Sequence, residues 1–84
     1  MKESYRTRGV CSTKIDFELE DGKVRNLHFS GGCEGNLKAI AKLTEGMDAE
    51  KVISLLEGNT CGPKNTSCAD QLARALKEAV QKDA

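Results

Sequence analysis

Several features that would indicate a membrane or nucleic-acid-binding protein are missing from this chain of 84 residues. It has no run of about 18 apolar residues, the length a helix needs to span a bilayer. Its first eight residues include no apolar segment of the kind that directs secretion. The 13 basic and 13 acidic residues cancel and form no basic block, so nucleic acid is an unlikely partner. We therefore expect a soluble, cytoplasmic protein without a membrane partner.

Aromatic residues and proline are also scarce, since the chain has no Trp, one Tyr, two Phe and one Pro. The core must therefore be mainly aliphatic. A chain this short is expected to form one domain, residues 1–84, and such a domain buries only about 60% of the surface that its unfolded chain exposes. Its stability should be modest, so a bound metal ion would contribute appreciably to it.

Residues 14–20 alternate apolar and charged side chains, as a strand with one buried face does. The dipeptide Asp21-Gly22 is typical of a two-residue hairpin, and a second strand should follow it over 24–29. Val24 is out of phase with the later apolar residues of that strand, which predicts a β-bulge or a later strand start. Residues 4–10 are a candidate edge strand.

The hydrophobic period changes to 3.6 after residue 30, which predicts helices. The first helix is expected to begin after Asn36 as N-cap and to end at Gly46. Its expected buried face consists of Leu37, Ile40, Ala41 and Leu43. The second is expected between Asp48 as N-cap and Glu57, and its expected buried residues are Val52, Leu55 and Leu56.

A loop over residues 58–66, which holds the only proline, separates these helices from a third. Ser67 or Thr66 is expected to cap the third helix, and with Ser67 as cap Asp70 stands close to a capping box. The expected buried stripe consists of Leu72, Ala73, Leu76, Ala79 and Val80. The predicted fold class is α+β, a small antiparallel sheet of two to three strands followed by three helices packed on one face.

The four cysteines Cys11, Cys33, Cys61 and Cys68 all stand at turns or helix starts and close to glycines. In a reducing compartment, thiols are more often metal ligands or redox groups than structural disulfides. Cys33 and Cys68 precede or begin helices, where unpaired backbone N–H groups favour a thiolate. The placement favours one metal site shared by all four cysteines. Two alternatives stay open: a redox disulfide, for which Cys61 and Cys68 have the shortest loop, and inert buried thiols.

Other residues with possible chemistry are less distinctive. His28 falls on the strand face opposite Leu27 and Phe29, so solvent exposure is expected rather than metal ligation. The glycine-rich segment 31–36 precedes a helix, but the lysine-serine pair and the further strand and helix of a nucleotide fold are missing. No set of Ser, His and Asp stands out. The sequence therefore shows no evident small-molecule substrate and no catalytic residues.

The motifs Gly31-Gly32-Cys33-Glu34-Gly35-Asn36, Cys61-Gly62 and Thr66-Ser67-Cys68-Ala69-Asp70 resemble those of the TSCPD-domain family. The resemblance covers nearly the whole chain, with Ala69 where the motif has proline. It implies zinc as the metal and Cys11, Cys33, Cys61 and Cys68 as its ligands. Small members of the family have no established activity, and a related domain ends some ribonucleotide reductases.

The order of Cys11, Cys33 and Cys68 around a hairpin is also similar, more distantly, to that of the IscU and NifU-type iron-sulfur scaffold proteins. Thr13 stands where those scaffolds have an aspartate, Ser67 where they have a histidine, and Cys61 has no counterpart. Four thiolates without labile ligands make a closed site, as in structural zinc sites.

Three functions follow as expectations. The first is a zinc-binding module that acts through an unknown protein partner and is not catalytic alone. The second is an iron-sulfur cluster scaffold or carrier that uses the same cysteines. The third, which the family resemblance alone implies, is an accessory role in ribonucleotide reduction, linked to ribonucleoside-diphosphate reductase.

Overall fold

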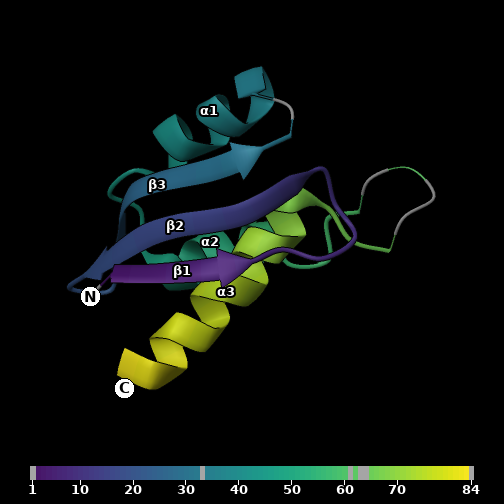
Figure 1. The fold of residues 1–84 in the computed structure, drawn as a ribbon. Helices are drawn as coiled ribbons and strands as arrows, with labels where there is room; N and C mark the ends of the chain where they lie inside the picture. Colours follow the sequence, from purple (N-terminus) through teal and green to yellow (C-terminus); the bar gives the residue numbers. More distant parts are fainter. Residues whose placement is uncertain (1, 33, 61, 63–64, 84) are drawn as a thin grey trace.

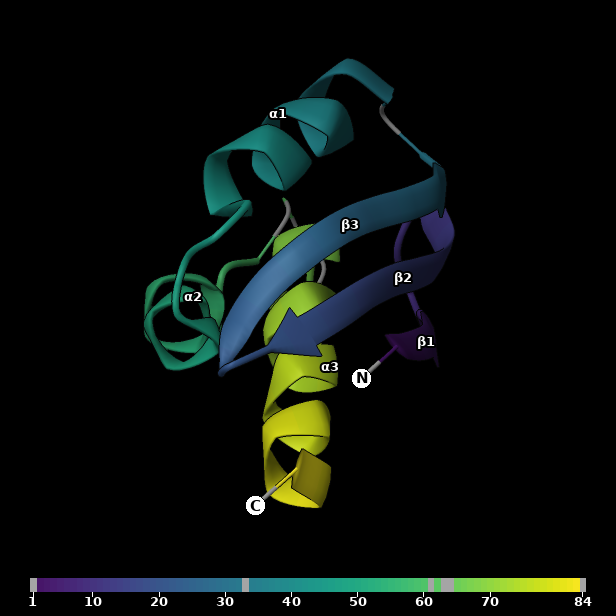
Figure 2. The same cartoon turned by 90° about the vertical axis from the view of Figure 1, so that its left-hand side faces the viewer.

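The structure, a computed structural model, describes residues 2–32, 34–60, 62 and 65–83. The chain order of its elements is β1 (Lys2–Arg6), β2 (Ser12–Glu20), β3 (Lys23–Gly31), α1 (Glu34–Thr44), α2 (Ala49–Leu56) and α3 (Cys68–Asp83). The strands form one antiparallel sheet in the order β1-β2-β3. The helices lie on one side of this sheet (Figure 1), and the view turned by 90° shows α3 behind β2 and α1 beside β3 (Figure 2). The predicted α+β class is confirmed.

The β2–β3 hairpin has the predicted tight turn. Asp21 and Gly22 have φ angles of 54° and 75°, and positive φ at both central residues is what a type I′ turn requires. The predicted bulge is also present, because the register shifts between Asp16 and Glu18, and Asn26 on the facing strand has a φ of 52°. One extra residue in β3 allows Val24 to be buried together with the apolar residues that follow the bulge.

The edge strand β1 lies earlier than predicted. It covers Lys2–Arg6 and pairs with β2 from Glu18 back to Lys14, whereas the sequence pointed to 4–10. Residues 7–11 instead form the return to β2, in which Gly9 has a φ of 70°. Glycine adopts this left-handed conformation without the steric cost that a Cβ atom would add.

The core lies between the sheet and the helices. Its fully buried large side chains come from both layers: Ile15, Val24, Val52, Leu72 and Leu76. Most of the predicted stripe of α3 is buried, and Ser67 caps this helix, because its Oγ accepts the backbone N–H of Asp70 at 3.1 Å. No helix in the described part of the chain is both long enough and apolar enough to cross a membrane.

Two leucines that were predicted to be buried are exposed. Leu43 in α1 is 75% exposed and Leu55 in α2 is 61% exposed. Each helical residue advances by about 100°, so Leu43 stands about 120° away from Leu37 around the helix axis. In α2 the buried face is centred between Val52 and Ile53, and Leu55 lies to one side of it. Both predictions are wrong because the angular positions of these leucines around the helix axes lie outside the buried faces.

The predicted start of the first helix is also wrong. The helix begins at Glu34, so Asn36 lies inside it rather than at its N-cap. The second helix begins as predicted, with Asp48 in an extended N-cap conformation, but the Asp48 carboxylate makes no capping hydrogen bond. It accepts one from the Lys23 ammonium at 2.9 Å instead.

Candidate metal centre

Cys11 and Cys68 meet at the end of the sheet where α3 begins. Cys11 immediately precedes β2 and is exposed, while Cys68 is the first residue of α3 and packs partly buried against the core. Their Sγ atoms are 3.6 Å apart. Because a disulfide bond is about 2.05 Å long, this separation is a contact between two sulfur atoms and not a covalent link. The structure thus brings together two of the four cysteines predicted as ligands.

A hydroxyl group and a glycine complete the surroundings of this pair. The Ser12 Oγ lies 3.2 Å from the Cys68 Sγ, within hydrogen-bonding distance. Gly32 has a φ of 81°, and a Cβ atom there would lie 3.0 Å from the Cys11 Sγ and 3.1 Å from the Ser12 nitrogen. Only glycine allows the chain to pass this close to Cys11 in this conformation.

The other two predicted ligands, Cys33 and Cys61, lie outside the described residues. The described residues that precede them lie near the cysteine pair. A Cβ atom added at Gly32 would meet the Cys11 sulfur, and Thr60 lines the same hollow as Cys11 and Cys68. Within the described ranges, no group of three or more His, Cys, Asp or Glu side chains is arranged to hold a metal ion. His28 is exposed on β3, as predicted.

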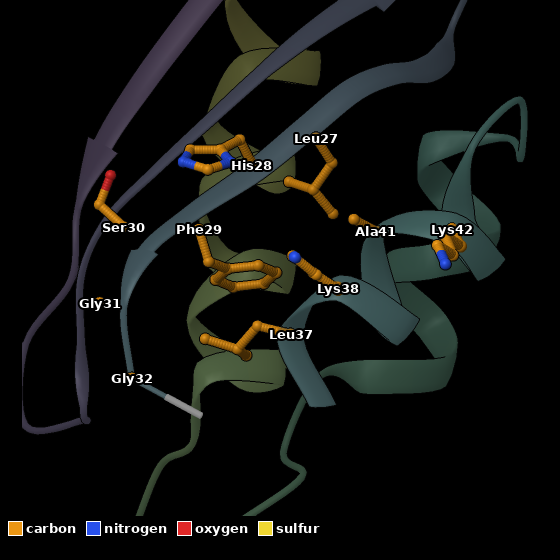
Figure 3. A pocket seen from close by; sticks show the side chains of 10 residues that line it. All are labelled: Leu27, His28, Phe29, Ser30, Gly31, Gly32, Leu37, Lys38, Ala41 and Lys42. Carbon is orange, nitrogen blue, oxygen red and sulfur yellow. The ribbon is translucent and has the colours of Figure 1, made fainter. Parts of the chain in front are cut away.

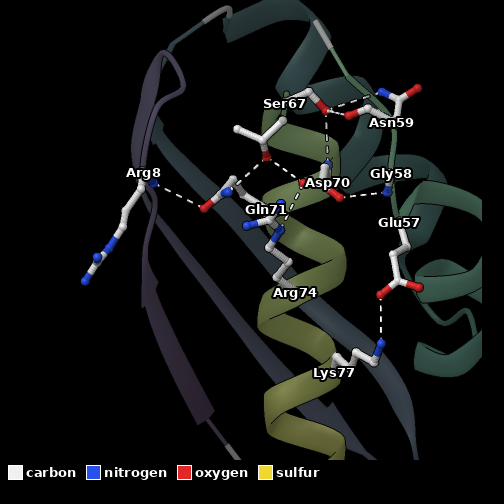
Figure 4. A network of polar contacts seen from close by, with 10 residues as sticks. Arg8, Glu57, Gly58, Asn59, Ser67, Asp70, Gln71, Arg74 and Lys77 are labelled. Carbon is white, nitrogen blue, oxygen red and sulfur yellow. Dashed lines mark hydrogen bonds and ion pairs between the residues drawn. The ribbon is translucent and has the colours of Figure 1, made fainter. Parts of the chain in front are cut away.

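A buried polar network surrounds Asp70, which follows Cys68 by two residues in α3 (Figure 4). Asp70 is 2% exposed, and its carboxylate accepts hydrogen bonds from the Thr66 hydroxyl at 2.5 Å and the Gly58 N–H at 2.7 Å. The Arg74 Nε lies 3.0 Å from the same carboxylate. Burial raises the pKa of Asp70, but the two hydrogen bonds and Arg74 together hold it below the usual 3.8.

The same network joins two loops to the start of α3. The Ser67 hydroxyl donates to the Asn59 carbonyl, and so ties the chain just before Cys61 to the helix cap. Gln71 donates from Nε2 to the Thr66 hydroxyl at 3.0 Å and accepts the Arg8 N–H at 3.1 Å. The sequence predicts only a capping role for Asp70 and no role for Gln71. The sequence signal for this network is the position of Gln71, a polar residue directly before Leu72 of the apolar stripe.

Each polar side chain of the segment 66–70 therefore has a distinct structural task. Thr66 binds Asp70, Ser67 caps the helix, and Cys68 presents its sulfur to Cys11. Ala69, which replaces the motif's proline, is buried and stands in the first helical turn, where proline and alanine are both tolerated.

Comparison with known protein families gives one match. The family model described as TSCPD domain matches residues 2–80, nearly the whole chain. No curated protein and no solved structure matches the chain significantly. Because this family model covers residues 2–80 of the 84, the chain belongs to the TSCPD-domain family.

Proposed function

We propose that this TSCPD domain is a zinc-binding module in which Cys11, Cys33, Cys61 and Cys68 are the four ligands. The observation that carries the proposal is the distance of 3.6 Å between the Cys11 and Cys68 Sγ atoms. Two thiolates on one tetrahedral zinc ion, each about 2.3 Å from the metal, are about 3.8 Å apart. The two sulfur atoms therefore fit adjacent corners of a zinc tetrahedron with almost no movement.

Neighbouring residues support Cys33 and Cys61 as the remaining ligands. Cys33 directly follows Gly32, which lies against the Cys11 sulfur, and Cys61 directly follows Thr60, which lines the hollow beside both described cysteines. The Ser12 hydroxyl can donate a hydrogen bond to the Cys68 sulfur, as groups around metal-bound thiolates commonly do. Four thiolates would make a closed site, which is typical of structural rather than catalytic zinc.

The function that follows is that of a cytoplasmic interaction or accessory module for a protein partner, without catalysis of its own. The family's association with ribonucleotide reductase makes an accessory role in ribonucleotide reduction one form of this proposal. Such a module needs a stable surface, and the metal would supply stability by joining the sheet to the last helix.

An iron-sulfur cluster on the same cysteines is the second candidate. It is favoured by the exposure of Cys11, because a ligand that solvent and other proteins can reach suits a cluster that is transferred. The distance between the two sulfur atoms does not distinguish zinc from an iron-sulfur cluster, since thiolates are ligands of both.

Metal analysis of the untagged protein tests the proposal. Protein purified without oxygen and without a metal-affinity tag should contain one zinc ion per chain, and Cys68→Ser should lose it. Ser54→Ala is a matched control, because this exposed hydroxyl bonds only within α2. A brown protein with iron and acid-labile sulfide would establish the second candidate instead. Less than one-tenth of an equivalent of either metal in the parent protein would refute both.

A further inference from the structure

Contacts between protein groups hold Cys11 beside Cys68. The segment before Cys11 is attached to α3, because the Arg8 N–H donates a hydrogen bond to the Gln71 Oε1 at 3.1 Å (Figure 4). Gln71 lies in the next turn of this helix after Cys68. On the other side of Cys11, the Ser12 Oγ lies 3.2 Å from the Cys68 Sγ. The fold itself therefore brings the two thiol groups together.

The two cysteines differ in their access to solvent. Cys11 is exposed at the end of the return from β1 to β2, whereas Cys68 is half-buried in the first turn of α3. Leu37, a buried residue of α1, lines both the hollow that holds the two cysteines and the groove between α1 and β3, and so stands between them (Figure 3). A small oxidant in solvent therefore meets the Cys11 sulfur more readily than the Cys68 sulfur.

A short movement would join the two sulfur atoms. Their separation is 3.6 Å. Because a disulfide bond is about 2.05 Å long, they need to approach by only about 1.5 Å. An exposed cysteine next to a second cysteine is a common arrangement in redox sensors. Loop length in the sequence favours Cys61 and Cys68 as a redox pair, whereas the sulfur contact in the described part of the chain is between Cys11 and Cys68.

We propose that Cys11 and Cys68 form a redox switch, in which a peroxide converts the two thiolates into a disulfide and so releases the metal. The release step rests on the proposed function, because it requires both cysteines to be metal ligands. The formation of the disulfide rests only on the contact between the two sulfur atoms and on the exposure of Cys11. Disulfides that form in reducing compartments are usually transient and redox-sensing, which fits such a role.

The reaction takes two steps and consumes one molecule of hydrogen peroxide. In the first step, the Cys11 thiolate attacks one peroxide oxygen, the O–O bond breaks and hydroxide leaves, so that Cys11 becomes a sulfenic acid. In the second, the Cys68 thiolate attacks the Cys11 sulfur, the S–O bond breaks and a second hydroxide leaves as the disulfide forms. The two thiolates lose two electrons, and the peroxide gains them.

The disulfide would take over one task of the metal while removing its ligands. Metals bind thiolates, so oxidation of the pair leaves only two of the four proposed ligands, Cys33 and Cys61. The new bond connects the return before β2 to the start of α3, the same two segments that a metal bound by both cysteines would connect. We therefore expect the oxidised, metal-free domain to unfold at a higher temperature than the reduced, metal-free domain.

Peptide mapping of the full-length protein tests the proposal. A lysine or arginine lies between each cysteine and the next, so trypsin places the four cysteines in separate peptides. Protein purified without oxygen is treated with hydrogen peroxide, blocked with iodoacetamide and digested without reductant, while a chromogenic chelator records zinc release in a parallel sample. We expect mass spectrometry to find the Cys11 peptide linked to the Cys68 peptide, zinc release in step with that link, and loss of the link in dithiothreitol.

A variant separates the switch from the proposed function. Cys33→Ser removes a proposed metal ligand but keeps the pair, so it should lose zinc and still form the disulfide. The zinc content of the untreated parent protein decides the proposed function, and the linked peptides of the parent protein decide the switch. Each of three results in the parent would overturn the switch: a link from Cys11 or Cys68 to Cys33 or Cys61, a link between two chains, or oxidation of Cys11 to a sulfinic or sulfonic acid without a link.

Discussion

The Sγ atom of Cys11 lies 3.6 Å from the Sγ atom of Cys68, although 57 residues separate the two in the chain. Cys11 ends the return from β1 to β2, and Cys68 begins α3. A metal ion bound by both would therefore connect the sheet directly to the last helix. Long-range links of this kind stabilise small domains most, because the unfolded chain loses the most freedom when distant segments are joined.

Removal of the metal should lower the thermal midpoint of unfolding strongly. The apparent binding free energy of small structural zinc sites, about 10 to 16 kcal/mol, is as large as the whole stability of a typical domain, about 5 to 15 kcal/mol. Circular dichroism melts with and without a strong chelator measure the difference. An unchanged midpoint, after metal analysis has verified removal, would contradict a structural role for the metal.

Gly32→Ala should destabilise the fold and weaken metal binding together. The substitution puts a Cβ atom at φ 81° and 3.0 Å from the Cys11 sulfur, and such backbone strain costs about 1 to 3 kcal/mol. Gly35→Ala is the matched control, because no atom lies within 4 Å of its added Cβ. Alanine inside a helix is favoured over glycine by up to about 1 kcal/mol, so the control should be neutral or stabilising. Chemical denaturation compares the two, and equal losses would contradict the prediction.

Much of the fold could be predicted because local patterns agree with it. The hairpin is predicted by the alternation of apolar and charged residues in β2 and by the Asp21-Gly22 turn. Its bulge is predicted by Val24, which is out of phase with the later apolar residues of β3. Interactions between distant segments could not be read in this way. The pairing of β1, for example, depends on Gly9, which turns the chain back towards β2.

The approach of Cys11 to Cys68 could be predicted from the sequence, but the contacts that support it could not. The positions of Cys11 and Cys68 at turn and helix signals suggested that they converge, and the structure brings their sulfur atoms together. The link from Arg8 to Gln71 spans 63 residues and leaves no periodic signal in the sequence. Cys33 and Cys61 lie outside the described residues, so their part in the site stays a prediction.

Asp70→Asn should destabilise the domain by about 1.5 to 3 kcal/mol, the usual value of hydrogen bonds to a charged group. The buried carboxylate accepts from Thr66 and Gly58 and pairs with Arg74, and the amide cannot accept through both of its terminal atoms. Asp48→Asn is the control, since this exposed carboxylate pairs with Lys23 at the surface and its loss should cost at most about 1 kcal/mol. Urea unfolding distinguishes the two, and equal effects would contradict the importance of the network.

Leu72→Ala and Leu55→Ala should differ widely although the chemical change is the same. Leu72 is 0% exposed, and such a truncation in a core costs about 2 to 5 kcal/mol. Leu55 is 61% exposed, so its truncation should change stability by no more than about 0.5 kcal/mol. Both residues lie in helices, which removes helix propensity as a cause of the difference. Similar losses in urea unfolding would show that Leu55 is covered in solution.

The final prediction concerns Cys61, which distinguishes a closed four-cysteine site from an open one. If Cys61 is the fourth ligand, Cys61→Ser exchanges a thiolate for a poor hydroxyl ligand and should weaken zinc binding by orders of magnitude, as Cys33→Ser would.

If Cys61 is not a ligand, three cysteines and an exchangeable group would hold the metal, which is the open arrangement of catalytic and transfer sites. Cys61→Ser would then keep its zinc while Cys33→Ser loses it. Competition with a chromogenic chelator measures both affinities, and Ser54→Ala again serves as control. We expect equal loss in the two cysteine variants, because the chain just before Cys61 is tied to the cap of α3 by Ser67 and Asn59, beside the Cys68 sulfur.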